Sequence, residues 1–128
     1  MPKPRTISLT DRAPVRIDED LWPVVATASD GVRMRNGTPL PDYEQAEWSL
    51  HVRQHADGRV LVYGGARAPS RGWPTHGASD WRGGELLAAG ADLAAAIGRV
   101  GADLVRLGGA PESVIRECIA DLPAEVLE

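Results

Sequence analysis

The sequence predicts an α+β fold, with a small antiparallel β-sheet of hairpins in the N-terminal two-thirds and two C-terminal α-helices packed on one face of it. Three observations predict this arrangement. Residues 47–66 form the best-defined β-hairpin pattern in the chain, and residues 92–107 and 111–122 each carry an apolar stripe with helical spacing. The 128 residues, of which 43% are hydrophobic and 25% charged, fit a single globular domain that spans residues 1–128.

The hairpin at residues 47–66 rests on alternation and on a turn. Apolar and polar side chains alternate over residues 48–53, which is the period of a strand with one buried face. Asp57 and Gly58 supply the reversal, and residues 60–63 return as a run of β-forming side chains. The two halves are therefore expected to pair as antiparallel strands.

The register of this hairpin decides which side chains share a face. A three-residue loop with Gly58 in the left-handed conformation pairs Val52 with Val62, whereas a two-residue loop pairs Val52 with Tyr63. We favour the three-residue loop, because it collects the valines on one core face. It leaves Leu61 and Tyr63 on the second face, which also needs cover, so packing of the helices there is expected, although the sequence by itself leaves open which face of the hairpin the helices cover.

Short extended segments precede the hairpin. Residues 6–10, 14–17 and 24–28 have the composition of strands, whereas residues 1–5 are expected to be a frayed lead-in. Residues 29–46 are rich in turn-forming residues, and an Asn-Gly pair among them is able to close a small hairpin. Few apolar residues follow that pair, so we expect a surface loop instead.

Both helices have recognisable ends. Asp92 is a good N-cap for the first helix, and glycines 108–109 end it. Gly98 and Gly101 weaken this helix but are small enough to let another backbone approach closely. Pro111 is suited to begin the second helix. The two apolar stripes consist of Leu93, Ile97, Val100, Leu104 and Leu107, and of Val114, Ile115, Cys118, Ile119 and Leu122.

Residues 67–84 follow neither the strand period nor the helix period, and we expect an irregular loop, which at this length is often functional. The segment places aromatic surface beside positive charge, and these residue types dominate protein-binding hot spots. Bases can also stack on indole rings while Arg contacts phosphates. The structural alternative is that its two Trp side chains fold back and cap the core. The candidate binding residues are Arg67, Arg71, Trp73, His76, Trp81 and Arg82.

Secondary candidates lie on the second face of the hairpin, namely His51, Arg53 and Tyr63. His51 and His55 are about 13 Å apart at ~3.3 Å per strand residue, so they cannot chelate one ion together. The chain has no His/Cys ligand pattern, nucleophile elbow or phosphate loop, and Cys118 lies on an apolar helix stripe as a buried structural thiol. We therefore expect no catalytic residue, no metal and no cofactor, and a protein that is not an enzyme.

The net charge of −4 is unevenly distributed along the chain. Residues 47–82 hold five Arg against three acids, whereas residues 83–128 hold three Arg against eight acids. The basic middle permits nucleic-acid binding, although a protein that coats nucleic acid is usually more basic than this. That alternative would use the two Trp together with Arg53, Arg59, Arg67, Arg71 and Arg82.

Composition also bears on location. No apolar run approaches the about 18 residues of a membrane span, and residues 1–11 lack the apolar core of a secretory signal. A single cysteine excludes an internal disulfide and fits a reducing compartment. We expect a cytoplasmic protein without a membrane partner. The sequence leaves the oligomeric state open, a homodimer included.

Three stretches carry a resemblance to a group of proteins. Residues 7–11 read Ile-Ser-Leu-Thr-Asp, residues 52–59 read Val-Arg-Gln-His-Ala-Asp-Gly-Arg, and residues 117–125 read Glu-Cys-Ile-Ala-Asp-Leu-Pro-Ala-Glu. Together they resemble small uncharacterised proteobacterial proteins associated with prophages and plasmids. The resemblance spans most of the chain. It implies a mobile-element setting and carries over no catalytic residues.

The sequence thus predicts a non-enzymatic accessory protein that acts by binding another protein, for instance as an inhibitor or regulator encoded by a mobile element. The alternative is a nucleic-acid-binding protein that uses the Arg/Trp segment. A third class, a hydrolase, would need His51 and His55 to converge on a pocket with an acid from elsewhere in the chain.

Overall fold

The computed structural model describes residues 3–41, 45–69 and 78–124. The chain is an α+β protein. Its strands are β1 (Pro4–Ile7), β2 (Val15–Asp18), β3 (Val24–Val32), β4 (Met34–Arg35), β5 (Thr38–Pro39), β6 (Ala46–Gln54), β7 (Val60–Pro69) and β8 (Ala78–Leu87). Its helices are α1 (Leu93–Gly108) and α2 (Ser113–Ala120).

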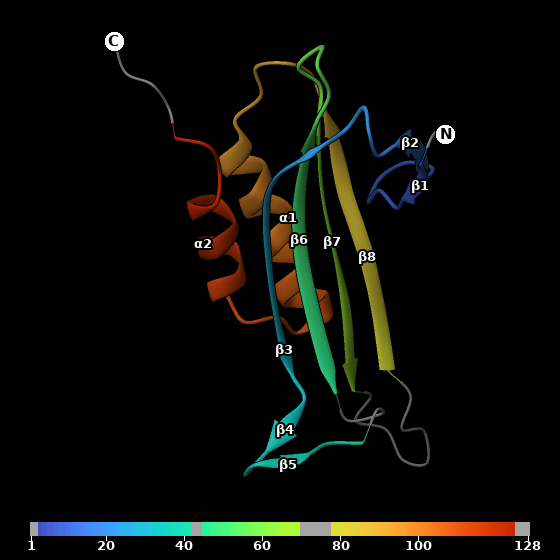
Figure 1. Cartoon of the computed structure of the whole chain (residues 1–128). Coiled ribbons are helices and arrows are strands. Elements are labelled where there is room, and N and C mark those ends of the chain that lie inside the picture. The colour runs from blue at the N-terminus through green and yellow to red at the C-terminus, as the bar shows by residue number, and fades with distance from the viewer. Residues whose placement is uncertain (1–2, 42–44, 70–77, 125–128) are drawn as a thin grey trace.

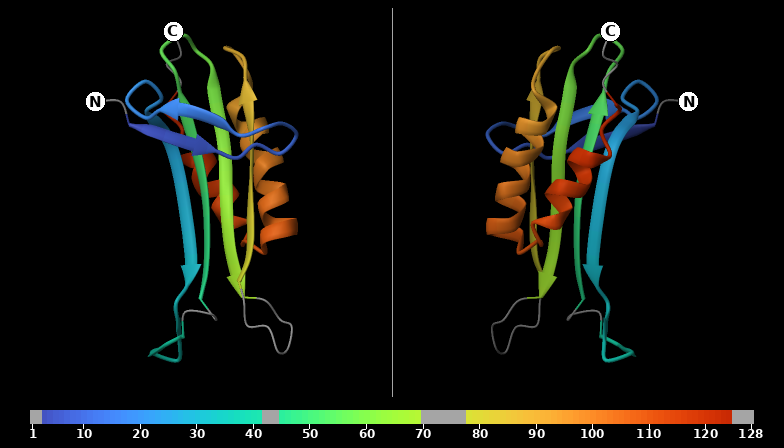
Figure 2. Two further views of the ribbon diagram at one scale, coloured as in Figure 1. Left: turned by 90° about the vertical axis from the view of Figure 1, so that its right-hand side faces the viewer. Right: turned by 90° about the vertical axis from the view of Figure 1, so that its left-hand side faces the viewer.

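Three layers make up the fold. The central layer is an antiparallel sheet in the order β3-β6-β7-β8, and both helices lie on one face of it (Figure 1). The β1–β2 hairpin lies across the other face, near the end where β6 turns into β7 (Figure 2). The sheet is therefore covered along one face and only in part on the other.

The favoured hairpin register is confirmed. Val52 lies opposite Val62, and Gly58 adopts a positive φ of 95°. The His55 backbone N–H donates to the Arg59 carbonyl at 2.9 Å, which closes the three-residue loop. The valines consequently share one buried face.

The helices cover the valine face, so the expectation that they cover Leu61 and Tyr63 is wrong. The stripes of both helices pack against an aliphatic surface built mainly by β6 and β7. Leu61 and Tyr63 are instead buried under Ile7, Ile17 and Trp22, around the β1–β2 hairpin. The physical reason is polarity. The second face also carries Arg and His side chains, which an apolar helix stripe cannot satisfy.

Strands β7 and β8 continue well into residues 67–84, which the sequence predicts to be a loop. The expectation of an irregular loop over 67–84 is wrong at both ends, because β7 runs to Pro69 and β8 starts at Ala78. Glycines hide the strand period here: Tyr63 lies opposite Gly84, and Gly64 lies opposite Gly83. Residues 70–77 lie outside the described part of the chain.

Two further expectations are corrected near the N-terminus. Residues 36–37 form the reversal of a small hairpin between β4 and β5, with φ angles of 52° at Asn36 and 78° at Gly37, so the expected surface loop is wrong. An Asn-Gly pair with both residues at positive φ suits the twist of a tight hairpin, even though its strands are exposed. The chain is also ordered earlier than expected, since β1 begins at Pro4.

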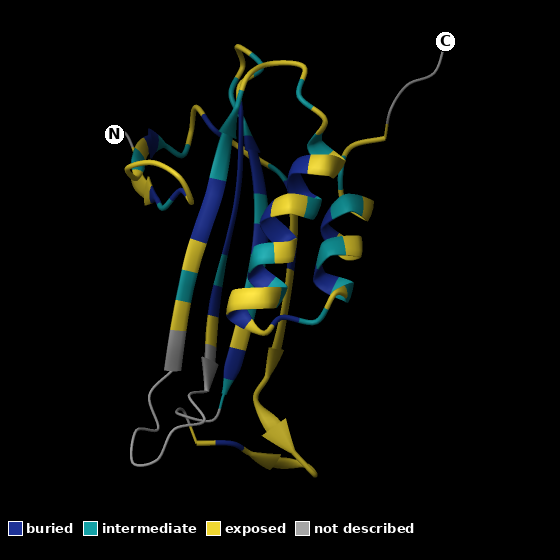
Figure 3. Cartoon of the chain, turned by 180° about the vertical axis from the view of Figure 1, so that it is seen from behind, coloured by how far each residue is buried: buried dark blue, intermediate teal, exposed yellow. Residues whose placement is uncertain are grey.

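The ends of α1 match the sequence patterns. Asp92 accepts a hydrogen bond from the Ala95 backbone N–H at 3.0 Å, and Gly109 ends α1 in the left-handed conformation. Gly101 faces α2 so closely that a Cβ there would lie 2.5 Å from Ile115 Cγ1, so the group that approaches this glycine is a side chain and not the expected backbone. The outer sides of both helices are exposed (Figure 3).

The prediction for the last residue of the first stripe is wrong. Leu107 is 50% exposed, although its neighbour Gly108 is buried against Ala66 of β7, so the last turn of α1 leaves Leu107 outside the contact with the sheet. The second helix begins at Ser113, two residues after the Pro111 start that the sequence suggests. None of the helices in the described ranges is long and apolar enough to cross a membrane.

Candidate functional site: a polar groove on the open sheet face

The part of the sheet that the β1–β2 hairpin leaves open forms a groove of about 800 Å³, which is in the size range of ligand-binding clefts. Its floor is the face of β3, β6, β7 and β8 that points away from the helices (Figure 2). The charged residues that line it are Arg5, Asp30, Arg33, Glu47, Arg67, Asp80 and Arg82. We call this surface the sheet groove.

At its outer end the sheet groove carries a row of alternating charge. Glu47 on β6 lies opposite Arg67 on β7, which lies opposite Asp80 on β8. Side chains directly across antiparallel strands are close neighbours, so this row places one positive group between two negative ones. Arg33 extends the alternation, since its Nη2 lies 2.7 Å from Glu47 Oε1.

The next row is lower and mostly uncharged. Ser49 lies opposite Gly65, which lies opposite Arg82. A Cβ at Gly65 would make only ordinary contacts, the nearest at 3.7 Å, so this row has room for a side chain that glycine does not supply. The row separates the outer charges from the inner end of the groove, which we define by Arg5, His51 and Tyr63.

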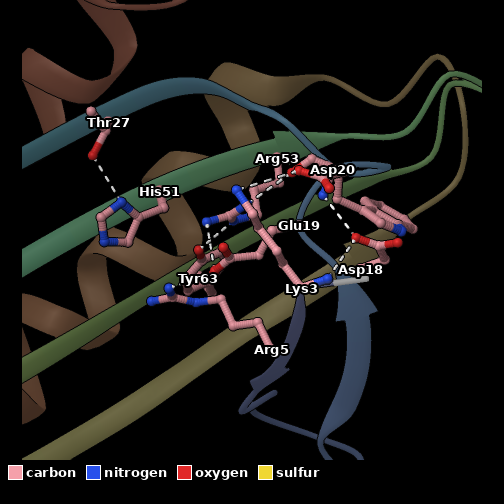
Figure 4. Close-up of polar contacts among 10 residues, drawn as sticks. Lys3, Arg5, Asp18, Glu19, Asp20, Thr27, His51, Arg53 and Tyr63 are labelled. Atoms are coloured by element: carbon pink, nitrogen blue, oxygen red, sulfur yellow. Dashed lines mark hydrogen bonds and ion pairs between the residues drawn. The ribbon is translucent and has the colours of Figure 1, made fainter. Parts of the chain in front are cut away.

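A buried arginine anchors the inner end. Arg53 is only 8% exposed, its Nε donates to the Tyr63 hydroxyl at 2.8 Å, and its Nη1 donates to the Trp22 carbonyl at 2.9 Å. Its Nη2 lies 3.7 Å from Glu19 Oε1, and Arg5 Nη1 donates to the same oxygen at 3.0 Å (Figure 4). This network joins the β1–β2 hairpin to the sheet.

His51 lies between this network and the edge of the sheet. Its Nδ1 is 2.8 Å from Thr27 Oγ1, and its ring centroid is 5.1 Å from that of Tyr63 (Figure 4). Burial lowers the pKa of the imidazole, and the positive charges of Arg5 and Arg53 lower it further. The ring is therefore held in its neutral form near pH 7.

The predicted binding residues of the 67–84 segment divide into three groups. Arg67 and Arg82 are exposed and line the sheet groove. Trp81 points to the other face, where it is half-buried and packs against the helix-covered core, as the alternative core-cap interpretation expects. The remaining candidates, Arg71, Trp73 and His76, lie outside the described residues.

Two of the three secondary candidates line the sheet groove, and the third is buried. His51 and Tyr63 lie opposite each other and line the sheet groove, as the favoured register implies. Arg53 shares their face but is buried, and its described contacts hold the fold together instead of facing a ligand.

The histidines needed for a hydrolase do not meet. His55 packs against Trp22 at a centroid distance of 5.1 Å, and its Nδ1 lies 3.2 Å from Asp57 Oδ2, at the tip of the hairpin. It lines a separate hollow of about 530 Å³, whereas His51 lines the sheet groove. The described residues include no three His, Cys, Asp or Glu side chains that could hold a metal ion.

Cys118 is a buried thiol, as expected from its place on the helix stripe. Burial raises its pKa to about 11, and the nearby Asp121 carboxylate adds to the rise. The thiolate is therefore scarce at neutral pH, which is the opposite of what a nucleophile requires.

Sequence reasoning missed Arg5 and Glu19 at the inner end. Arg5 falls in the stretch expected to fray, and its partner Glu19 is 14 positions away. Alternation within β1 could have placed Arg5 on the same side as the buried Ile7, had the strand been recognised as starting at Pro4.

Comparison with known proteins yields no match, either to a family model, to a curated protein or to a solved structure.

Proposed function

We propose that this protein is a non-enzymatic accessory protein of the cytoplasm that binds another protein through the sheet groove. The observation that carries the proposal is the alternating row of Glu47, Arg67 and Asp80 on an open sheet face. Fixed charges of both signs favour a partner that presents the complementary pattern, which gives specificity more than raw affinity.

The row also argues against the alternative of nucleic-acid binding. A phosphate backbone attracted by Arg67 and Arg82 would meet Glu47 and Asp80 directly beside them. Like charges would then offset much of the gain that counterion release gives a uniformly basic surface. A protein surface of mixed sign has no such conflict.

The resemblance to mobile-element proteins supports a setting for this function. An inhibitor or regulator encoded by such an element can act on a target protein by binding alone, without catalysis. We therefore propose an inhibitor or regulator, and the predicted contacts at Arg71, Trp73 and His76 remain part of this proposal.

The test compares two charge-reversal variants of the full-length protein. The groove variant carries Arg67→Glu and Arg82→Glu, and the control carries Arg106→Glu and Arg116→Glu on the exposed sides of α1 and α2. A partner captured from host lysate and purified should bind the groove variant at least tenfold more weakly, with no loss for the control. Equal binding by both variants contradicts the proposal.

A second arm separates the two classes of partner. Binding to a single-stranded oligonucleotide is measured over a salt series with the same two variants. Salt-sensitive binding lost only in the groove variant would support the nucleic-acid alternative instead. No binding at low salt eliminates that alternative.

A further inference from the structure

The inner end of the sheet groove holds more positive than negative charge. The guanidinium groups of Arg5 and Arg53 share the single carboxylate of Glu19, at 3.0 Å and 3.7 Å. Lys3 lies 4.0 Å from Asp20, and its backbone N–H donates to Asp18, so these two carboxylates lie beside Lys3. Among the groups in direct contact, Arg5 and Arg53 therefore have one carboxylate between them, beside an opening to solvent.

Hydrogen-bond donors converge on the same place. The Tyr63 hydroxyl accepts from Arg53 Nε, so its own proton is free to be donated elsewhere. Arg5 uses Nη1 for Glu19, and its side chain is 46% exposed, so further N–H groups face the groove. Both groups come from rigid strands, β1 and β7.

His51 completes the constellation. Its Nδ1 contacts Thr27, and its Nε2, on the opposite side of the ring, has no protein partner among the described residues. All buried side-chain nitrogen and oxygen atoms in the described part of the chain do have partners, which places Nε2 at the open side. The Thr27 hydroxyl donates its single proton to the Leu50 carbonyl at 3.1 Å and therefore accepts from Nδ1, so the neutral ring carries its proton on Nδ1. Nε2 donates to a carboxylate only once the ring is protonated, so binding of a carboxylate here takes up a proton.

We propose that the inner end of the sheet groove is a carboxylate-binding site, which takes an Asp or Glu side chain of the partner protein between Arg5, His51 and Tyr63. This inference rests on the proposed function, since it names the group by which the partner is recognised.

The local chemistry selects a carboxylate over other groups. A cation is repelled by Arg5 and Arg53, and a neutral amide gains nothing from their charge. A phosphate dianion brings two charges where one is unmatched. A carboxylate matches that single charge, accepts in the plane of a guanidinium fork, and has an oxygen left for the Tyr63 hydroxyl and for the protonated His51 ring.

Occupancy of the site should be visible at His51. The charged groups that act on its pKa are Arg5 from β1 and Arg53 from its own strand, both of which contact Glu19, and its neutral neighbours are Thr27 and Tyr63 (Figure 4). Arg5 and Arg53 hold its pKa down. A bound carboxylate offsets their charge, so binding should raise the pKa of His51.

The experiment uses the full chain and a defined probe. The probe is acetyl-Gly-Glu-Gly-amide, and its control is acetyl-Gly-Gln-Gly-amide, which has the same shape without the charge. NMR spectra follow the imidazole signals of His51 and the ring signals of Tyr63 during titration with each peptide. We expect saturable shifts and an upward move of the His51 pKa with the Glu peptide alone.

Variants locate the site. Arg5→Gln and His51→Gln should each weaken binding of the Glu peptide at least fivefold, whereas Arg106→Gln on the exposed side of α1 should leave it unchanged. Arg5→Gln also removes a contact of the β1–β2 hairpin, so the backbone signals of β1 and β2 are checked for a folded hairpin. His51→Gln leaves that contact in place and decides the matter if the first variant loosens the hairpin.

The peptide titration and the partner-binding test can fail independently of each other. Equal shifts with both peptides, shifts that never saturate, or binding unaffected in both variants would overturn the carboxylate site. Such a result leaves partner capture by the groove untouched. Conversely, saturable binding of the Glu peptide with no partner captured would support the site and contradict its use in protein binding.

Discussion

Thr27 and Asp121 are joined by a hydrogen bond of 2.8 Å across 94 positions of the chain, from the Thr27 backbone N–H to Asp121 Oδ2. Thr27 belongs to β3, an edge strand, so its outward N–H has no neighbouring strand to bind. Asp121, which directly follows α2, covers it. Gly31, four residues further along β3, has its N–H bound by Asp30 Oδ1 at 2.7 Å. Carboxylates thus cap an edge that would otherwise invite strand addition.

Replacing this cap should weaken the protein and expose its edge. Asp121→Ala removes the acceptor of the Thr27 N–H and should lower the free energy of unfolding by about 1 kcal/mol. Asp121→Asn keeps an oxygen acceptor and should lose less. Urea denaturation measures both, and light scattering detects any self-association through β3. Equal stability of wild type and Asp121→Ala would show that the bond contributes nothing.

Arg53 should be the arginine on which stability depends most. Arg53→Met leaves the Tyr63 hydroxyl, the Trp22 carbonyl and Glu19 without a buried partner and should cost about 3 kcal/mol. Arg59→Met is the control, because Arg59 is half-exposed, and its stacking on Trp22 at 5.1 Å and its ion pair with Asp57 at 2.8 Å are surface contacts worth about 1 kcal/mol or less each. Chemical denaturation of both variants tests the ranking, and similar losses would refute it.

Two glycines of α1 should respond to alanine with opposite sign. Gly98 has no atom within 4 Å of a built Cβ, so Gly98→Ala should stabilise the helix by up to about 1 kcal/mol. At Gly101 the new methyl would lie 2.5 Å from Ile115 Cγ1 and push α1 from α2, which should cost about 1–3 kcal/mol. Thermal unfolding reports both changes. If Gly101→Ala is as stable as wild type, α1 and α2 can move apart without loss of unfolding free energy, and the prediction is wrong.

The histidine in the sheet groove predicts a pH dependence. Since burial and then Arg5 and Arg53 lower the pKa of His51 below 6.5, the unfolded chain binds a proton more readily than the folded one. This contribution to stability is complete above about pH 6.5 and is lost as the pH falls towards the folded pKa.

His51→Gln should therefore flatten the stability profile below about pH 6.5, down to the pKa of the folded His51. Glu19 and Asp57, whose pKa values are lowered chiefly by hydrogen bonds to Arg5 and to the Arg59 backbone, add their losses only at lower pH. The midpoint of urea denaturation, measured across the pH range for wild type and His51→Gln, tests this. If the midpoint of His51→Gln falls with pH as steeply as that of wild type, the pH dependence of stability comes from another group.

Features set by neighbours in sequence were predictable. The turn at Asp57-Gly58, the N-cap at Asp92 and the left-handed end at Gly109 each depend on a few consecutive residues, and each forms as expected. The extension of β7 and β8 was not predictable in this way. Its strands contain glycine pairs without side-chain alternation, and only the ladder between them makes the segment extended.

The candidate site shows the same division. Arg67 and Arg82 were identified by residue type, and they do reach the sheet groove. Trp81, identified with them, turns to the core because its strand position pairs with Ala66 on the helix side. Arg5 belongs to the site because of its contact with Glu19, and no pattern of neighbouring residues in the sequence predicts that contact.

Local sequence was therefore enough to determine that this chain forms a hairpin-led sheet followed by two capped helices, because turn and cap energies act within a few residues. Only the tertiary structure decided which face each layer covers. An aliphatic face could be buried by apolar helices, whereas a face with a buried Arg53 required the hydrogen bonds and the carboxylate that the β1–β2 hairpin and the turn after it bring. That choice left the sheet groove open.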